Sequence, residues 1–257
     1  QRYFNQRQAR VQQIRQASTP ECILIWAWLG VIIFLSFGLP ISWMVVWSWA
    51  AIQDGLIDST FWLYSLNSYG LAFAAASIAT VAALPVAFYH HRNNSFKSQS
   101  MMQVASVGFV LPGPVIALGI ITFLVSQLPL LYGGVTALIL ALVIRFLPLA
   151  IQAQDAAIQQ LTPSIEQAGR MLGAGPWENM RRVVLPTIKG GLGSAWVLVF
   201  IDTLKELPAT LIMRPTGFDT LPVRIWIEAS EEMLELAAPA ALLLVLCTLP
   251  VLWFLLK

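Results

Sequence analysis

Six long apolar segments limit the possible folds of this 257-residue chain more than any other feature. Each has roughly 20 residues or more, the length that an α-helix needs to cross about 30 Å of hydrocarbon. They lie at 23–49, 66–89, 103–126, 131–151, 191–213 and 236–256. Because 58% of the residues are hydrophobic and only 11% are charged, the chain is too apolar for a water-soluble domain of this length. The sequence therefore predicts an all-α integral membrane protein with six transmembrane helices.

Proline and glycine interrupt several of these segments. The third contains Leu111-Pro112-Gly113-Pro114, the second contains Pro85 and the fifth contains Pro208. Broken helices are tolerated in a membrane where neighbouring helices or a water-filled cavity satisfy the freed backbone groups. Each proline is therefore interpreted as a kink, with the lining of a transport path as the alternative.

Lys and Arg are unevenly distributed between the two sides that the six spans define. Positively charged loops stay on the cytoplasmic side of a membrane. One side carries eleven of the 15 basic residues, namely Arg2, Arg7, Arg10, Arg15, Arg92, Lys97, Arg170, Arg181, Arg182, Lys189 and Lys257. The other side carries Arg214 and Arg224, while Arg145 and Lys205 lie within spans. Both termini and the long loop after the fourth span are therefore predicted to be cytoplasmic.

The opposite side is acidic. Its carboxylates are Asp54, Asp58, Asp219, Glu228, Glu231, Glu232 and Glu235. A dense group of acids, as in 227–235, is usually a solvated face. The alternatives are a docking surface for an extracytoplasmic partner and an electrostatic funnel for a cation.

The polar loop 162–186 is predicted to form two short amphipathic helices joined by a glycine turn. Thr162 can cap the first helix with Pro163 at its first position, and Gly173 can end it. Pro176 can begin the second helix, which is predicted to end at Leu185-Pro186. The apolar stripes are Ile165, Ala168 and Leu172 in the first helix and Trp177, Met180 and Val184 in the second.

A hairpin of this pattern is typical of three kinds of element. A nucleic-acid reader is disfavoured, because the loop lies between two membrane spans and its charge is balanced. An interfacial hairpin that lies on the bilayer and a docking element for a soluble partner both remain open.

The fifth span contains three charged residues, Asp202, Lys205 and Glu206. Their spacing of i, i+3 and i+4 would place all three on one face of a helix. Charges inside a span are costly and occur mostly at paired or functional positions. The sequence therefore predicts either an Asp202–Lys205 pair within the bundle or the lining of a translocation pathway or its gate. Arg145 is near the inner end of the predicted fourth span, where its long side chain could reach the interface.

The sequence contains no pattern typical of an enzyme. It has no glycine-rich phosphate loop and no nucleotide fingerprint. Cys22 and Cys247 belong to separate apolar segments without metal-ligand spacing. His90 and His91 are neighbours that point in different directions on a helix, so a solvated pair is expected. We therefore expect no catalytic, cofactor or metal site.

The loop 162–186 resembles the coupling loop of binding-protein-dependent ABC importer permeases, whose transmembrane domain is of the MetI-like type. The family pattern is Glu-Ala-Ala, three residues, Gly, nine residues and Ile-x-Leu-Pro. Here it reads Gln167-Ala168-Gly169, Gly173 and Val183-Val184-Leu185-Pro186 with the same spacing. Gln167, Gly169 and Val183 depart from the family residue types, and Glu166 stands one position before the usual acid.

The resemblance implies that this loop contacts an ATPase. The residues carried over to that role are Glu166, Gln167, Ala168, Gly169, Gly173, Val183, Leu185 and Pro186.

The segment 202–210, followed by 214–221, is similar to the fifth span of ferric-iron permeases. Those permeases usually fuse two six-helix halves, and this chain looks like the second half. Thiamine, phosphonate and oxyanion permeases carry related segments, so the same importer class for another small solute is the first alternative. A secondary transporter or channel that needs no ATPase is a more distant one.

The resemblance implies an organisation and a set of partners. Residues 1–64 would form a cytoplasmic basic arm and the first transmembrane helix, and 65–257 the permease domain. The implied partners are a cytoplasmic ABC ATPase dimer that uses ATP, a periplasmic iron-binding protein, a second permease half and the lipid bilayer, without nucleic acid. The implied location is the bacterial inner membrane.

Overall fold

The computed structural model describes residues 18–93, 95–161, 169, 171, 173 and 175–255. Within these residues the chain is helical and contains no β-strand. The chain divides into two compact units, Gln1–Trp43 and Met44–Lys257. The predicted functional boundary between residues 64 and 65 stays a prediction.

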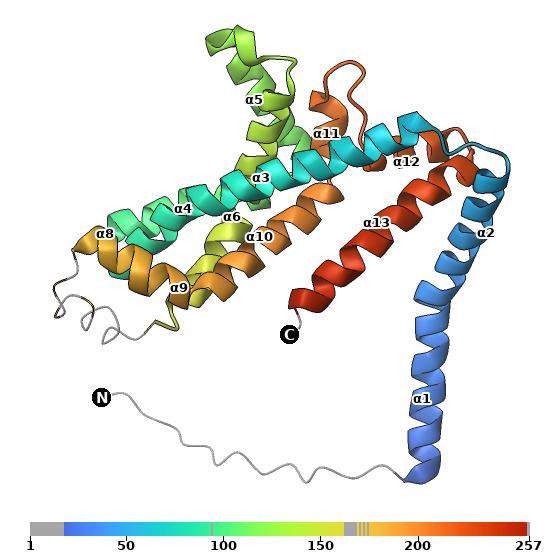
Figure 1. Ribbon diagram of the computed structural model, residues 1–257, viewed down its shortest axis with the longest axis horizontal. Coiled ribbons are helices and arrows are strands. Elements are labelled where there is room, and N and C mark those ends of the chain that lie inside the picture. The colour runs from blue at the N-terminus through green and yellow to red at the C-terminus, as the bar shows by residue number, and fades with distance from the viewer. Residues whose placement is uncertain are drawn as a thin grey trace, which may run out of the picture. The chain divides into compact units, whose positions relative to one another are not determined.

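Figure 1 shows the helices of the described residues. The first segment consists of α1 (Thr19–Ile33), a π-helical turn (Phe34–Gly38) and α2 (Leu39–Gln53). The next elements are α3 (Ser59–Arg92), α4 (Phe96–Val110), α5 (Gly113–Gln127), a 3-10 turn (Pro129–Leu131) and α6 (Val135–Ile158). The last are α8 (Pro176–Asn179), a π-helical turn η3 (Met180–Val184), α9 (Leu185–Thr187), α10 (Lys189–Leu204), α11 (Pro208–Met213), α12 (Leu221–Ser230) and α13 (Leu234–Leu255).

Among the described residues, four continuous helical segments are long and apolar enough to cross a membrane, and the number rises to six if each of two bent pairs is one span. The continuous segments are Thr19–Gln53, Ser59–Arg92, Val135–Ile158 and Leu234–Trp253. The α4–α5 pair bends by 110°, and the segment Trp177–Thr187 bends by 69° against α10. The all-α membrane fold is thus confirmed. The third predicted span is broken between α4 and α5, and the fifth is broken between α10, which ends at Leu204, and α11, which begins at Pro208.

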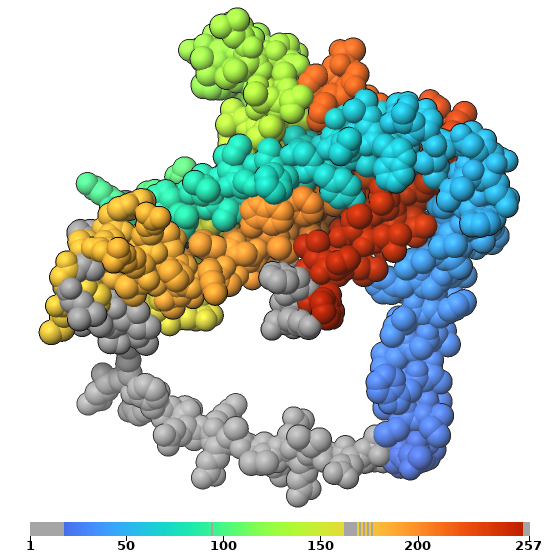
Figure 2. Space-filling model, viewed as in Figure 1, coloured from blue at the N-terminus to red at the C-terminus, as the bar shows by residue number. Residues whose placement is uncertain are grey.

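The helices α3, α6 and α10 form the core of the second unit. Figure 2 shows the surfaces of α3 and α10 in direct contact. Small side chains fill the α3 face of this core: Ala72, Ala75, Ala76, Ala79 and Ala83 are fully buried. Because lipid is as apolar as the helix surfaces, membrane helices associate through close packing of small residues. The core therefore depends on backbones that approach closely.

Glycine permits two of the closest approaches. A Cβ atom on Gly108 of α4 would lie 2.2 Å from the carbonyl oxygen of Ile144 in α6. A Cβ atom on Gly191 of α10 would lie 2.1 Å from Cβ of Ala157, also in α6. α4, the first helix of the bent pair, thus packs directly against α6.

Gly108→Ala should separate α4 from α6. The added methyl group meets a backbone atom that cannot rotate away, so we expect a loss of about 1–3 kcal/mol of stability. Thermal unfolding of the purified protein in detergent measures this loss. Gly119→Ala in α5 is the control, because nothing lies within 4 Å of its Cβ position. Equal melting temperatures for the two variants would contradict the close packing.

Candidate functional site

The second helix of the predicted hairpin begins and ends close to its predicted bounds. The segment starts at Pro176 and continues through η3 to Thr187. Gly173 has φ +84°, a left-handed conformation that suits a residue directly after a helix. The predicted start at Pro176 is therefore confirmed, and the glycine stop stays a prediction with which this conformation of Gly173 agrees. Residues 162–168, 170, 172 and 174, which include Glu166, Gln167 and Ala168, lie outside the described residues.

The hairpin is anchored to the bundle at the end of its second helix. Val184 and Ile188 are buried and form a cluster with Ala87 and Phe88 of α3 and with Ile158 of α6. This apolar cluster is separate from the main core. A displacement of the hairpin would therefore be transmitted to the ends of α3 and α6.

The members of the predicted stripe of Trp177, Met180 and Val184 differ in exposure. Val184 is buried, whereas 76% of Trp177 is exposed. The π-helical turn Met180–Val184 changes the register of a regular 3.6-residue helix, which periodicity could not reveal. The hairpin consequently exposes two large apolar side chains at its other end, Trp177 and Met171, the latter 89% exposed.

Gly169 allows the two parts of the hairpin to touch. A Cβ atom on Gly169 would lie 2.2 Å from Oδ1 and 3.0 Å from Cγ of the buried Asn179. It would also lie 3.3 Å from Cγ2 of Val183. The glycine, which departs from the alanine of the resembled pattern, is therefore matched to the asparagine that it faces.

A second site lies where the two interrupted spans meet α6. Arg145 of α6 forms an ion pair with Glu206, with 3.2 Å between Nε and Oε2. Its Nη1 also donates a hydrogen bond of 3.2 Å to the carbonyl oxygen of Leu111, at the break between α4 and α5. Glu206 Oε1 accepts a hydrogen bond of 3.2 Å from the Ala209 N–H at the start of α11. One arginine thus binds both breaks.

Both charged side chains are largely shielded from solvent, with 20% of Arg145 and 7% of Glu206 exposed. Gly113 leaves room for the pair, because a Cβ atom there would lie 2.7 Å from Glu206 Oε1 and 3.1 Å from Arg145 Nη1. Each charge has an opposite charge and a backbone partner. This pairing offsets the free-energy cost of burying two charged side chains inside the bundle.

The prediction that Asp202, Lys205 and Glu206 share one helical face is wrong for Glu206. α10 ends at Leu204, and α11 begins only at Pro208, whose ring cannot continue the hydrogen-bond ladder. Asp202 and Lys205 do form the predicted ion pair, at 2.7 Å between Oδ1 and Nζ. That pair is peripheral, since 66% of Lys205 is exposed.

The prediction that Arg145 extends to the inner interface is also wrong. α6 continues to Ile158, so Arg145 lies 13 residues before its end, about 20 Å along the helix axis. The ion pair joins residues from different spans, which local spacing could not show. The available signal was that a positive and a negative charge in separate spans tend to pair with one another.

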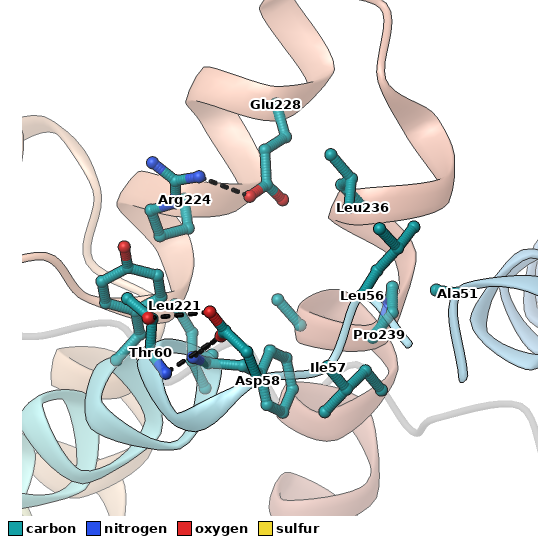
Figure 3. A pocket seen from close by; sticks show the side chains of 13 residues that line it. Ala51, Leu56, Ile57, Asp58, Thr60, Leu221, Arg224, Glu228, Leu236 and Pro239 are labelled. Carbon is teal, nitrogen blue, oxygen red and sulfur yellow. Dashed lines mark hydrogen bonds and ion pairs between the residues drawn. The ribbon is translucent and has the colours of Figure 1, made fainter. Parts of the chain in front are cut away.

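A third site is a cavity lined by α3, α12, α13 and the end of α2 (Figure 3). It has a volume of about 200 Å³. The carboxylates of Asp58 and Glu228 lie on its wall, together with Arg224. Arg224 Nη2 donates to Glu228 Oε1 at 2.8 Å, and its guanidinium lies 5.1 Å from the centre of the Tyr64 ring.

Asp58 is the N-cap of α3 and lies before the span. Hydrogen bonds from the Phe61 N–H, the Thr60 hydroxyl and the Thr60 N–H lower the pKa of Asp58, and desolvation opposes them without reversing the shift. Its carboxylate is therefore ionised at neutral pH. Arg214 and Asp219 form a further ion pair in the segment between α11 and α12. Among the described residues, no group of three or more His, Cys, Asp or Glu could hold a metal ion.

Interrupted spans around a helical core, with the segment 176–187 packed against the ends of α3 and α6, agree with a membrane permease of the ABC importer class. Residues 79–256 match the family of binding-protein-dependent transport system inner membrane components. The chain belongs to this family, and it is a multi-pass membrane protein.

Two relatives illustrate the range of solutes. The chain is 30% identical over 237 residues to the Fe(3+)-transport system permease protein FbpB 2 of Haemophilus influenzae, covering 91% of this chain and 46% of the relative. It therefore spans about half the length of that relative. It is 25% identical over 227 residues to the putative 2-aminoethylphosphonate transport system permease protein PhnV of Salmonella typhimurium, covering 79% and 85% of the two chains.

Solved structures share the fold. A bacterial ABC transporter that imports alginate superposes with a TM-score of 0.69 at 16% identity, covering 91% of this chain and 93% of the other. The inward-facing MetNI methionine transporter superposes with a TM-score of 0.60 at 17% identity, covering 77% and 95%. The MetI-like expectation is confirmed.

Gly169→Ala should loosen the hairpin, since its methyl group overlaps the side chain of Asn179. We expect faster hydrogen exchange of the backbone at 176–187 and a local loss of about 1–3 kcal/mol. The double variant Gly169→Ala/Asn179→Ala should recover part of this loss, as a double-mutant cycle would detect.

Gly190→Ala is the matched control, because its Cβ position has nothing within 4 Å. If exchange in the Gly169→Ala variant equals that of the control, the contact with Asn179 does not hold the hairpin together.

Proposed function

We propose that this chain is one permease half of an ATP-driven importer that moves ferric iron, delivered by a periplasmic binding protein, across the bacterial inner membrane. The observation that carries the proposal is the construction of the hairpin. Val184 and Ile188 tie it to α3 and α6, while Met171 and Trp177 remain exposed at its other end. A segment that transmits movement from a partner to the bundle needs one end packed against the bundle and one end exposed to the partner.

The driver in this proposal is a cytoplasmic ATPase dimer that receives the exposed end of the hairpin in a groove. ATP is bound and hydrolysed by that partner. Movement of the hairpin would shift α3 and α6, and α6 carries Arg145, which binds both interrupted spans. The bundle would then alternate between two arrangements whose populations the ATPase biases by binding them differently.

Ferric iron is favoured over other solutes by the relative that names Fe(3+), which matches 91% of this chain. The segment 202–221, similar to that of ferric-iron permeases, agrees with this choice. An ionised Asp58 and the acidic outer side would raise the local concentration of a cation or of a partner with a basic surface. A phosphonate is the second candidate, because the 2-aminoethylphosphonate relative matches 79% of the chain.

A second permease half completes the proposed machine. The chain spans 46% of the length of the ferric relative, which leaves room in that relative for another set of spans. In the proposed orientation, the hairpin and both ends of this chain face the cytoplasm, where Lys and Arg predominate.

Reconstitution tests the proposal. Proteoliposomes would contain this chain, its second half and the ATPase, with the binding protein outside. We expect ATP hydrolysis and uptake of radioactive iron only with the iron-loaded binding protein. If aminoethylphosphonate is taken up and iron is not, the solute is a phosphonate and the ferric-iron assignment is wrong. Uptake driven by an ion gradient without the ATPase would overturn the importer proposal.

Trp177→Ala should weaken binding of the ATPase. Buried Trp side chains are common hot spots at interfaces, and truncation typically costs about 2 kcal/mol, or roughly 30-fold in affinity. Affinity of the detergent-solubilised permease for the ATPase measures the effect. Trp28→Ala is the control, since Trp28 is exposed on the first span, which in the proposed assembly faces lipid. If the Trp177→Ala and Trp28→Ala variants bind the ATPase with equal affinity, Trp177 is not part of the interface.

Glu206→Ala should impair transport but not membrane insertion. The variant leaves Arg145 without its carboxylate partner inside the bundle, so uptake should fall by at least about tenfold. Lys205→Ala should have a much smaller effect, because Lys205 is mostly exposed. Normal uptake by a well-expressed Glu206→Ala variant would exclude Glu206 from the pathway or its gate.

A further inference from the structure

A narrow polar chamber lies beside Glu206, between α3, α10, α11 and the start of α12. The residues that line it include four with hydroxyl groups, Ser68, Thr203, Thr210 and Thr220, in addition to Glu206. In this arrangement the chamber is too narrow to hold a water molecule.

Three of the hydroxyl groups have no hydrogen-bond partner among the described residues. They are the Oγ1 atoms of Thr203, Thr210 and Thr220, in side chains that are 3%, 1% and 2% exposed. Ser68 differs, because its Oγ accepts a hydrogen bond of 2.7 Å from the Leu221 N–H. The unpartnered groups come from three separate elements, so they are brought together only by the fold.

Burying a hydroxyl without a partner costs free energy. Valine has nearly the same shape and would fill this space without that cost. Three unpartnered threonines around one chamber therefore do not serve the packing of this closed arrangement. Their hydroxyls become useful when the chamber widens and takes up water or an oxygen-rich solute, to which a hydroxyl can both donate and accept.

Movement of the segment between α10 and α11 would widen the chamber, because this segment carries Glu206 and leads into Thr210. Arg145 restrains that segment through its ion pair with Glu206 and ties it to Leu111 at the other break. Ala209 completes the restraint by donating to Glu206 Oε1. Release of Glu206 from Arg145 would free a carboxylate at the chamber wall at the moment when the chamber opens.

We infer that the chamber lined by Thr203, Thr210, Thr220 and Glu206 is a hydrophilic section of the translocation path, closed here, and that Arg145 is the positioning residue that keeps it closed. The ligand class is a small hydrated ion together with its water. The inference rests on the proposed transport function. It adds the residues that line one section of the path and a role for Arg145, neither of which that function requires.

Cysteine labelling tests the chamber. Thr210→Cys would be introduced after Cys22→Ser and Cys247→Ser remove the natural thiols, in proteoliposomes that contain the second permease half, the ATPase and the binding protein. A small charged methanethiosulfonate that cannot cross the membrane is the probe. We expect almost no labelling at rest and at least a tenfold faster rate during ATP turnover. Thr80→Cys is the matched control, since its hydroxyl is also buried and unpartnered but does not line the chamber.

The role of Arg145 in keeping the chamber closed is tested without the ATPase. Arg145→Gln should label Thr210→Cys at least tenfold faster at rest, whereas Arg145→Lys, which keeps the charge, should restore slow labelling. A general loosening of the bundle would also expose Thr80→Cys, so its continued protection separates closure of the chamber by Arg145 from a structural role.

The outcomes distinguish this inference from the proposed function. If ATP hydrolysis responds to the binding protein but Thr210→Cys stays unreactive in every state, the chamber is not part of the path although the importer stands. If hydrolysis never responds, the importer proposal fails, and labelling of the Arg145→Gln variant still decides whether Arg145 closes the chamber. If Arg145→Gln does not fold, the turnover experiment with Arg145 intact decides the inference by itself.

Discussion

The Arg145–Glu206 ion pair is the interaction on which the centre of the bundle depends. It joins α6 to the break between α10 and α11, and the hydrogen bond to Leu111 adds the break between α4 and α5. Interrupted helices leave backbone groups that lipid cannot satisfy, so they persist only where protein groups bind them. A single guanidinium and a single carboxylate meet part of that need at both breaks, and Gly113 provides the space.

The packing around this pair explains how distant parts of the chain are connected. Alanine-lined α3 and the glycine contacts of α6 bring the backbones close, which makes α3, α6 and α10 a stiff unit. Buried polar groups reinforce it, since Gln154 Nε2 donates to the Thr80 carbonyl at 2.8 Å and Trp196 Nε1 donates to Ser77 Oγ at 3.0 Å. The hairpin is anchored to the ends of two of these helices, so a force on it reaches the ion pair through α6.

Local signals predicted much of the architecture. Apolar length located four continuous spans and two bent helix pairs, and Pro176 located the start of the second helix of the hairpin, because both depend on neighbouring residues alone. The same reasoning failed at Glu206, where Pro208 was interpreted as a kink and α10 instead ends. Periodicity also could not reveal the π-helical turn at Met180–Val184.

The sequence by itself determined that the chain crosses a membrane several times, which side is richer in positive charge, and which loop can form a two-helix hairpin. Composition and short-range spacing carry that information. Only the tertiary structure decided that Arg145 belongs with Glu206, that Gly169 faces Asn179, and that threonines from α10, α11 and the loop before α12 enclose one chamber. Those relations join residues far apart in the chain, and the packing of helices, not any local preference, brings them within contact distance.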